Sequence, residues 1–197
     1  MVQRPTADEP TADISQAVWR TVAEDGIEAT TVRRVAERAG CTTGRIMHHF
    51  RTRSAMLIHA RELLYERTAA RADAAERAIG DPQERLIEVL SGSLTLDAER
   101  GQEARVWTGF AAAALPDGDM RQTHIASTRR WRARIESLVE ACAGQASTTA
   151  TRHAAMRLIA LTEGLAGLSS LDPDSYPPEQ QTTLLREEVT LTLRALA

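Results

Sequence analysis

The 197-residue sequence predicts an all-α protein, with an N-terminal three-helix helix-turn-helix domain, a C-terminal helical bundle and about nine helices in total. Three observations carry this prediction. Apolar residues recur at helical spacing nearly throughout the chain. Alanine, leucine, arginine and glutamate dominate the composition, while aromatic residues make up only 4%. Glycine and proline residues separate the periodic segments, and no run of residues indicates a β-strand.

The first three helices are expected near the N-terminus. Apolar spacing over residues 14–22 predicts a first helix that stops before Gly26. The spacing over 32–39 predicts a second helix, which Gly40 ends, and residues 43–50 make a short third helix. The region therefore contains two short helices joined by a glycine turn.

The rest of the chain predicts six longer helices. The first runs over 54–79 and is broken by Gly80 and Asp81, after which Pro82 can open the next helix. The other five are expected over 83–97, 102–114, 119–143, 148–171 and 179–196. Breaks between these are expected at Gly101, Pro116 to Gly118, Gly144, and Asp172 to Pro178.

The composition indicates a water-soluble globular protein, with 43% hydrophobic and 26% charged residues. No stretch approaches the roughly 18 apolar residues of a membrane span, so no membrane partner is expected. Residues 1–14 lack an apolar signal core and indicate a short disordered arm. Cys41 and Cys142 lie far apart without metal-ligand spacing. We therefore expect no disulfide framework, no metal site and a cytoplasmic location.

Residues 30–53 stand out by their charge. The chain carries a net charge of −3, yet this segment holds six arginines against the single acid Glu37, which makes it +5 by itself. The arginines are Arg33, Arg34, Arg38, Arg45, Arg51 and Arg53. A basic segment on an acidic chain indicates a local surface that binds a polyanion.

The same segment has the pattern of a helix-turn-helix, in which one helix crosses the DNA backbone and the next enters the major groove. Gly40 permits the tight turn between the two helices. Thr42 is a suitable N-cap for the second helix, whose exposed start carries Thr43, Gly44 and Arg45. Arginine can hydrogen-bond guanine with two donors, and glycine allows close approach of the backbone. The inner contacts are expected from Val35, Ala36, Ala39, Cys41 and Ile46.

Residues 14–58 resemble the DNA-binding region of the tetracycline-repressor (TetR) family. The matching features are Ala17 to Gly26, TTVRRVAERAG, TTGRIMHHF, and the basic Arg53 before Ser54. The resemblance implies DNA contacts from the exposed start of each helix and from the basic exit. The expected DNA-binding residues are Thr31, Arg33, Thr42, Thr43, Gly44, Arg45, His48, His49 and Arg53.

The sequence departs from the family pattern at Met47, where a phosphate-binding tyrosine is usual, and at Arg53, where lysine is usual. Methionine cannot replace the tyrosine hydroxyl, so His48 or His49 is a candidate for that contact. Adjacent residues point to different faces of a helix, which disfavours a shared metal site. We expect one histidine near DNA and the other against the long helix. Cys41 is expected to be a packed thiol, with a redox sensor as the alternative.

The C-terminal part resembles the ligand-binding and dimerisation domain of BetI-type repressors in three stretches: ARVWTGFAAAALP, RRWRARIESLV and LIALTEGLAGLSSLDPDSYPPEQ. The resemblance implies a dimer formed by a four-helix bundle of the last two helices of each protomer. The expected interface residues are Leu161, Gly164, Leu165, Leu168, Leu184, Val189 and Leu193. Gly164 and Gly167 give that helix a face of small residues, and a close contact within one protomer is the alternative reading.

Large aromatic residues are few in this C-terminal part, which makes them candidates for an effector pocket. The candidate lining residues are Trp107, Phe110, Ala111, His124 and Trp131. Ordinary core packing is the alternative for the aromatic residues. The BetI-type resemblance also brings choline into consideration, since an aromatic cage suits a quaternary ammonium.

The sequence shows no catalytic motif: it has no G-x-S-x-G elbow, no glycine-rich phosphate loop and no H-E-x-x-H. We expect no enzyme activity, no cofactor and no catalytic residue. The predicted function is a ligand-responsive repressor that binds a palindromic DNA operator as a homodimer. Residues 1–53 would bind DNA, and 54–197 would dimerise and bind an unidentified small molecule. The alternative is a small-molecule-binding helical protein or enzyme whose basic segment is merely structural.

Overall fold

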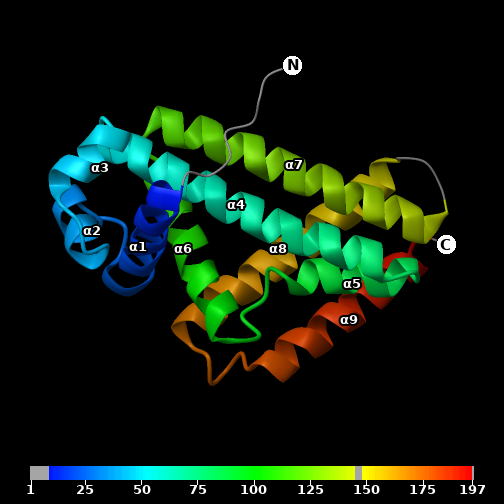
Figure 1. The fold of residues 1–197 in the computed structure, drawn as a ribbon. Helices are drawn as coiled ribbons and strands as arrows, with labels where there is room; N and C mark the ends of the chain where they lie inside the picture. Colours follow the sequence, from blue (N-terminus) through cyan, green and yellow to red (C-terminus); the bar gives the residue numbers. More distant parts are fainter. Residues whose placement is uncertain (1–8, 145–147, 197) are drawn as a thin grey trace, which may run out of the picture. The chain divides into compact units, whose positions relative to one another are not determined.

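The computed structural model describes residues 9–144 and 148–196, and within these ranges the chain forms nine helices and no strand (Figure 1). This confirms the predicted all-α fold class. The helices are α1 (Glu9–Asp25), α2 (Val32–Arg38), α3 (Thr43–His49), α4 (Arg53–Ala78), α5 (Pro82–Ser91), α6 (Ala98–Ala114), α7 (Gly118–Ala143), α8 (Thr149–Leu171) and α9 (Pro178–Arg194).

The helices divide into two compact units, and the chain passes between them more than once. Unit 1 contains the described residues up to Glu66 together with Arg105–His124, and unit 2 contains Arg67–Ala104 and the described residues from Ile125 onward. The core of unit 1 joins α1, α2 and α3 to the start of α4 and the second half of α6. Its wholly buried apolar side chains include Ile14, Val18, Val35, Ile46, Leu57 and Phe110.

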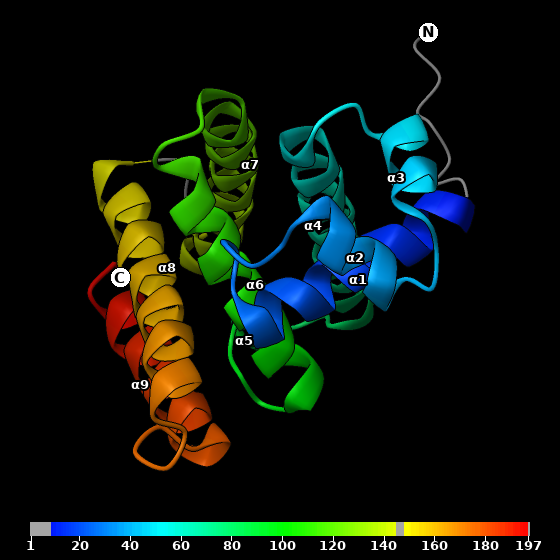
Figure 2. The ribbon, with the colours of Figure 1, turned by 90° about the vertical axis from the view of Figure 1, so that its left-hand side faces the viewer.

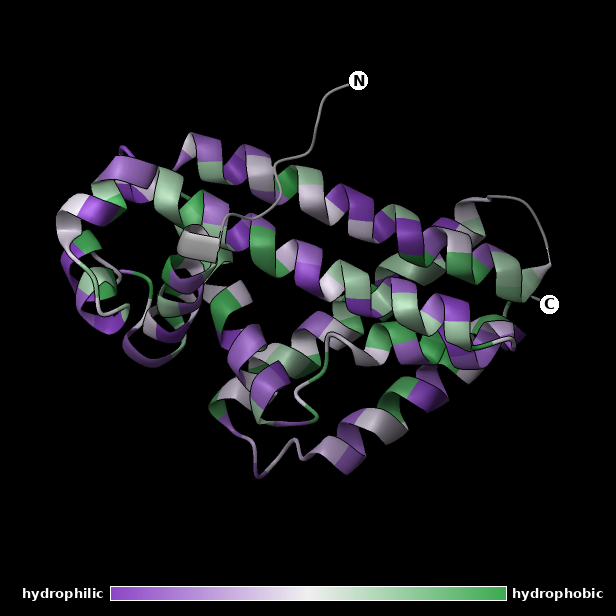
Figure 3. Cartoon of the chain, viewed as in Figure 1, coloured by the Kyte–Doolittle hydropathy of each residue, from purple (hydrophilic) through white to green (hydrophobic). Residues whose placement is uncertain are grey.

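The core of unit 2 is formed mainly by α5, α8 and α9. Helix α5 packs against both α8 and α9, and α8 lies beside α9 (Figure 2). Their buried faces meet in a single apolar cluster that includes Leu86, Leu90, Leu158, Leu165, Leu185 and Val189. Hydrophobic and hydrophilic residues are interspersed along the helices (Figure 3), as expected when one face of a helix lies in a core and the other faces water.

Three predicted boundaries are wrong. Helix α1 already begins at Glu9, so residues 9–14 are helical where the sequence indicated a disordered arm; residues 1–8 lie outside the described part. The predicted helix over 83–97 ends at Ser91, and α6 starts at Ala98 with Gly101 inside it. A polar cap sets the early start of α6, because Asp97 accepts a hydrogen bond of 2.8 Å from the Arg100 backbone N–H.

The connection between α5 and α6 is held by long-range hydrogen bonds. The Thr95 backbone N–H donates to Oε1 of Gln181 at 3.1 Å, and Nη2 of Arg71 donates to the Gly92 carbonyl oxygen at 3.2 Å. Gln181 is wholly buried on α9. These partners lie far along the chain, so local sequence patterns could not predict where α5 stops.

Every helix of the described part is too short or too polar to cross a membrane. Both cysteines, Cys41 and Cys142, are free thiols and half-buried. Burial raises the pKa of Cys142 to about 11, which keeps this thiol protonated at neutral pH.

Candidate nucleic-acid interface

Helices α2 and α3 form a helix-turn-helix in which both helices are capped by threonine. The Thr31 side chain accepts a hydrogen bond of 3.1 Å from the Arg34 backbone N–H, and the Thr42 side chain accepts one of 3.2 Å from the Arg45 N–H. Each cap satisfies one of the free amides at a helix start. The predicted cap at Thr42 is confirmed, and Thr31 is the corresponding N-cap of α2.

The turn between the two helices depends on Gly40, whose φ of +64° is strained for residues with a side chain. The next residue closes the turn, because the Cys41 backbone N–H donates to the Ala36 carbonyl oxygen at 3.0 Å. Val35 and Ile46 are wholly buried, Ala36 nearly so, and all three belong to the core of unit 1. The inner face of the motif therefore fixes the angle at which α3 is presented.

The outer face of the motif exposes most of the residues predicted to bind DNA. Exposed side chains or backbone belong to Thr31, Arg33, Thr42, Thr43, Gly44, Arg45, His48 and His49. A shallow hollow of about 430 Å³ lies between the helices, lined by Arg33, Ala36, Glu37, Cys41 and Thr43. The hollow thus brings Arg33 of α2 beside Thr43 at the start of α3.

Gly44 is exposed at the second position of α3. A Cβ added there would meet only the Thr42 hydroxyl oxygen, at an ordinary contact distance of 3.7 Å. The fold of the protomer therefore does not require glycine at this position. A close approach by a binding partner is a physical reason for glycine to stand there.

Two arginines of the basic segment are neutralised by acidic residues of α1. Nε of Arg34 lies 2.8 Å from Oδ2 of Asp25, and Arg38 contacts both Asp25, at 3.1 Å, and Glu24. The hydrogen bond from Arg34 lowers the pKa of the Asp25 carboxyl below its usual value. These two guanidinium groups are thus already engaged by acids within the protomer.

Three other arginines keep their charge available on the surface. Arg33, Arg45 and Arg51 are exposed, and none of them forms an ion pair with any of the described residues. Positive charge in the helix-turn-helix is therefore concentrated on the outer face of α2, at the start of α3 and just after its end.

Arg53, the ninth residue of the predicted set, is half-buried and holds the α1–α2 loop. Its Nε donates to the Thr30 carbonyl oxygen at 2.7 Å, and its Nη2 donates to the Ile27 carbonyl oxygen. Because a guanidinium has five N–H donors, the donors that remain can still bind a phosphate. Local sequence patterns could not indicate this second role, since the loop carbonyls precede Arg53 by more than twenty residues.

Both histidines of α3 are exposed, so the expectation that one packs against the long helix is wrong. Their rings stand edge to face, with centroids 5.4 Å apart. A different histidine, His59 of α4, packs against Phe50 at 5.0 Å between ring centroids. Met47 is 44% exposed beside them, an apolar side chain on an otherwise polar surface.

The residues predicted to line an effector pocket are divided between the two units. Trp107, Phe110, Ala111 and His124 belong to unit 1, whereas Trp131 packs on the core of unit 2. Phe110 is wholly buried, and Trp107 lies against the same core with ring centroids 6.5 Å apart. Core packing thus accounts for Phe110.

Arg61 is a buried cation that the sequence interpretation missed. It is 1% exposed, and its guanidinium carbon lies 5.1 Å from the centroid of the Trp107 ring, a cation–π distance. Its Nη2 is 3.3 Å from Nδ1 of His124. Burial, and secondarily the charge of Arg61, lower the pKa of His124. The spacing of the sequence could have indicated that Arg61 is buried, because Arg61 follows Leu57 by four residues and so lies on the apolar side of the long helix.

Trp131 carries a buried polar atom without a partner. Its indole nitrogen Nε1 is buried and has no hydrogen-bond acceptor among the described residues. A buried N–H of this kind costs free energy unless an acceptor reaches it. The indole therefore offers a donor to a ligand or a water.

The residues predicted for a dimer interface separate into a buried and an accessible group. Leu165 and Val189 lie in the core of unit 2, with 5% and 0% of their surface exposed. Leu161 and Leu193 are half-buried, and Gly164, Leu168 and Leu184 are exposed. A dimer contact in this region would therefore use the exposed residues, with Leu165 and Val189 supporting them from within.

Two family models together cover most of the chain. Residues 14–60 match the bacterial regulatory proteins of the tetR family, and residues 82–194 match the C-terminal domain of BetI-type transcriptional repressors. A curated relative is the HTH-type transcriptional regulator PksA of Bacillus subtilis, with 32% identity over 163 residues, which are 81% of this chain and 78% of the relative.

Solved structures of regulators share the fold. A transcriptional regulator from Rhodococcus sp. Rha1 is 29% identical with a TM-score of 0.87, covering 95% of this chain and 97% of that one. A transcriptional regulator from Saccharomonospora viridis, solved in complex with choline, has a TM-score of 0.84 at 20% identity and covers 92% of this chain and 96% of that one. The latter likeness is one of fold.

Proposed function

Since this chain belongs to the TetR family of HTH-type transcriptional regulators, with a C-terminal domain of the BetI type, we propose that it is a ligand-responsive repressor. In this proposal a homodimer binds a palindromic operator and leaves it when a small molecule binds. The observation that carries the proposal is the exposed start of α3, where Thr43, Gly44 and Arg45 stand free of protomer packing.

In the proposed complex, α3 enters the major groove with its first turn against the bases. Arg45 is suited to guanine, because its two parallel N–H groups match the O6 and N7 acceptors. Thr43 can contact a thymine methyl group, and Gly44 lets the backbone approach. This assignment gives base recognition to residues whose side chains are exposed and do not contribute to the core of the protomer.

Phosphate contacts are proposed for the residues that surround this turn. The Thr31 and Thr42 oxygens already accept backbone N–H groups, so each hydroxyl proton remains available for a phosphate oxygen. Arg33, His48 and His49 are exposed beside them, and Arg53 can add its remaining N–H donors. Such contacts position the protein without reading the sequence.

A homodimer accounts for the exposed apolar residues of unit 2. Met156, Leu168 and Leu171 of α8 are 53%, 48% and 88% exposed, and Leu184 and Leu191 of α9 are 42% and 60% exposed. Apolar side chains that gather on exposed helix faces indicate an interaction surface. A two-fold dimer reads two half-sites of opposite orientation, whose centres lie about 34–36 Å or a multiple of this apart.

In this proposal, DNA binding and effector response are carried out by different parts of the chain. Residues up to 53 bind DNA, and the remainder dimerises and responds to an effector in the cytoplasm, where the operator lies. For the effector, the indole N–H of Trp131 offers a hydrogen-bond donor that an acceptor-bearing molecule would satisfy. A ligand changes the DNA-binding equilibrium only by its different affinity for the two states.

A choline cage built from the three predicted aromatic residues has little support. Phe110 is wholly buried, and the Arg61 cation already lies over Trp107. A second cation near that ring would be repelled. We therefore expect millimolar choline neither to raise the melting temperature nor to release operator DNA. A clear upward shift with choline would contradict this part of the proposal.

The proposal is tested by a gel-shift and footprinting experiment on the DNA that flanks the chain's own gene. The expected result is a protected palindrome, with affinity that falls steeply between low and moderate salt, by about 10³–10⁵-fold for 6–10 phosphate contacts. Binding that is equally strong on unrelated DNA, or absent, would instead favour the alternative of a small-molecule-binding helical protein or enzyme.

A further inference from the structure

We infer that two copies of this chain pair through α9 in antiparallel orientation, with the two-fold axis passing between Thr190 and Leu191. In this arrangement Glu187 of each copy faces Arg194 of the other, on both sides of the axis. The inference rests on the proposed homodimer and goes beyond it by specifying which residues meet and in which register.

The outward face of α9 carries a stripe with the spacing of a helix-pairing surface. Leu184, Glu187, Leu191 and Arg194 are all exposed and lie three, four and three residues apart. The opposite face is buried in unit 2 through Gln181, Leu185, Val189 and Thr192. Alternating steps of three and four place a stripe along one side of a helix.

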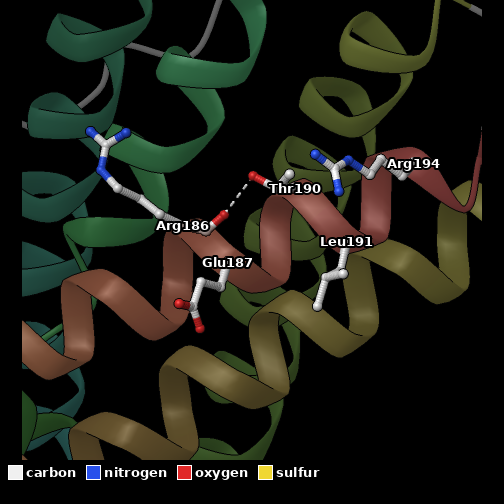
Figure 4. Close-up of a pocket in the computed structure, with 5 residues that line it drawn as sticks. All are labelled: Arg186, Glu187, Thr190, Leu191 and Arg194. Atoms are coloured by element: carbon white, nitrogen blue, oxygen red, sulfur yellow. Dashed lines mark hydrogen bonds between the residues drawn. The ribbon is translucent and has the colours of Figure 1, made fainter.

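The close-up of this region shows how the stripe is presented. Glu187 and Leu191 project from one side of α9, whereas Arg186, Thr190 and the guanidinium group of Arg194 lie on the other (Figure 4). Together these residues line a shallow hollow of about 420 Å³. Leu191, with 60% of its surface exposed, is the apolar side chain of this hollow that a partner would cover.

The charges on this stripe have no partner within the protomer. Neither Glu187 nor Arg194 forms an ion pair with any residue in 9–144 or 148–196. The neighbouring charge of Arg186 is engaged, because its Nη1 and Nη2 lie 2.8 Å and 2.9 Å from the two carboxylate oxygens of Glu84. Glu188 accepts a hydrogen bond of 3.2 Å from Thr192. Glu187 and Arg194 are therefore left for an external partner.

Two-fold symmetry then selects the register. An axis at Glu187 would place this carboxylate against its own copy, and an axis at Arg194 would do the same with two guanidinium groups. An axis midway between Glu187 and Arg194 places Glu187 of each copy opposite Arg194 of the other, so that two ion pairs can form. With a rise of about 1.5 Å per residue, each charge lies roughly 5 Å along the helix from that midpoint. Helix axes about 8–10 Å apart are within the span of two such long side chains.

Charge reversal tests the inference on the full-length protein. Glu187→Arg places two arginines against each other, and Arg194→Glu places two glutamates against each other. We expect either variant alone to weaken dimerisation about tenfold or more, measured by sedimentation equilibrium. An equimolar mixture of the two variants restores both ion pairs, so heterodimers of nearly wild-type affinity are expected.

Control variants distinguish failure of the proposed register from failure of the proposed homodimer. Glu179→Arg reverses an exposed charge in the first turn of α9, away from the proposed axis, and is expected to leave dimerisation unchanged. Circular dichroism checks that each variant is folded, and Glu187→Gln gives a milder loss if Glu187→Arg fails to fold. A wild-type dimer that tolerates both reversals, or a mixture that stays monomeric, overturns this register while the proposed homodimer stands. A wild-type monomer overturns both.

Discussion

Nε of Arg53 donates a hydrogen bond of 2.7 Å to the carbonyl oxygen of Thr30, the residue just before the N-cap of α2. A second donor of the same guanidinium binds the carbonyl oxygen of Ile27. The first residue of α4 therefore fixes the loop that positions the helix-turn-helix. A basic residue at the exit of the motif thus has a structural role in addition to any contact with DNA.

Replacing Arg53 by alanine should lower both stability and DNA affinity. The loss of charge-assisted hydrogen bonds is expected to reduce the free energy of unfolding by roughly 1.5–3 kcal/mol, measured by urea denaturation. Arg51→Ala is the matched control, because Arg51 is exposed and has no ion pair among the described residues. It should leave stability unchanged and lower the salt slope of operator binding by about 1. Equal stability of the two variants would show that the loop contacts do not persist in solution.

Arg45→Ala tests the proposed base contact. Arg45 is exposed in the first turn of α3, and only its backbone N–H takes part in the cap. We expect operator affinity to fall by about 1–3 kcal/mol and base preference to relax at one position of each half-site. Selection from a randomised operator library measures the preference. Unchanged preference at every position would remove Arg45 from base recognition.

Gly44→Ala separates folding from DNA binding. The added methyl group meets only the Thr42 hydroxyl oxygen, at 3.7 Å, so the melting temperature should stay the same or rise slightly. If DNA approaches the backbone here, operator affinity should fall severalfold. Gly40→Ala is the contrasting variant, because its φ of +64° makes a side chain costly and should lower stability instead. Full operator affinity in Gly44→Ala would exclude close backbone approach.

Gly109→Ala should destabilise unit 1. A Cβ at Gly109 of α6 would lie 2.5 Å from Cγ1 of Val22 in α1, which is far below a normal contact. Overpacking of this kind costs about 1–3 kcal/mol, which exceeds the helix propensity gain of up to about 1 kcal/mol. Adding Val22→Ala should recover part of the loss, so the two effects will not add. Gly118→Ala, which meets nothing within 4 Å, is the control.

Stability should fall as the solution is made acidic. Burial lowers the pKa of His59, and burial followed by the charge of Arg61 lowers that of His124. Glu62 and Glu66 oppose the shift at His59 only in part. Both imidazoles therefore stay neutral in the folded state over a range in which the unfolded chain binds protons.

The free energy of unfolding is thus expected to be fully retained above the ordinary histidine pKa of about 6.5 and to decline below it. Urea denaturation at a series of pH values measures the slope. His124→Gln should flatten it, because one of the two groups is removed. A slope of the opposite sign would contradict the assigned direction of both pKa shifts.

Much of the fold could be predicted because its signals are local. Apolar spacing located the helices, and Thr31, Gly40 and Thr42 marked the ends of α2 and α3 where the structure has them. The α5–α6 connection could not be predicted in the same way. Gly101 resembles a helix break in the sequence, yet it lies inside α6, whose start is set by the Asp97 cap.

Local sequence signals predicted only some of the residues of the candidate site. Residue type and spacing identified Thr43, Gly44 and Arg45 on the outer face of α3, but they did not show that His48 and His49 are both exposed. They did not show that Arg61 would be buried against Trp107, because a cation on an apolar stripe is ordinarily solvated. The family resemblance, and not local spacing, suggested Leu165 and Val189 for a dimer interface, and the structure shows that both side chains lie in the core of unit 2.

The sequence by itself determined that a helix-turn-helix with an excess of positive charge is present, since helix periodicity, caps and net charge depend on residues near one another. Only the tertiary structure decided which arginines remain available to bind DNA. Asp25 and Glu24 engage Arg34 and Arg38, and the α1–α2 loop engages Arg53, across separations of 9 to 26 residues. The physical reason is that packing of α1 and α4 on the motif brings these acids and carbonyls within hydrogen-bond distance, and spacing along the chain does not encode that approach.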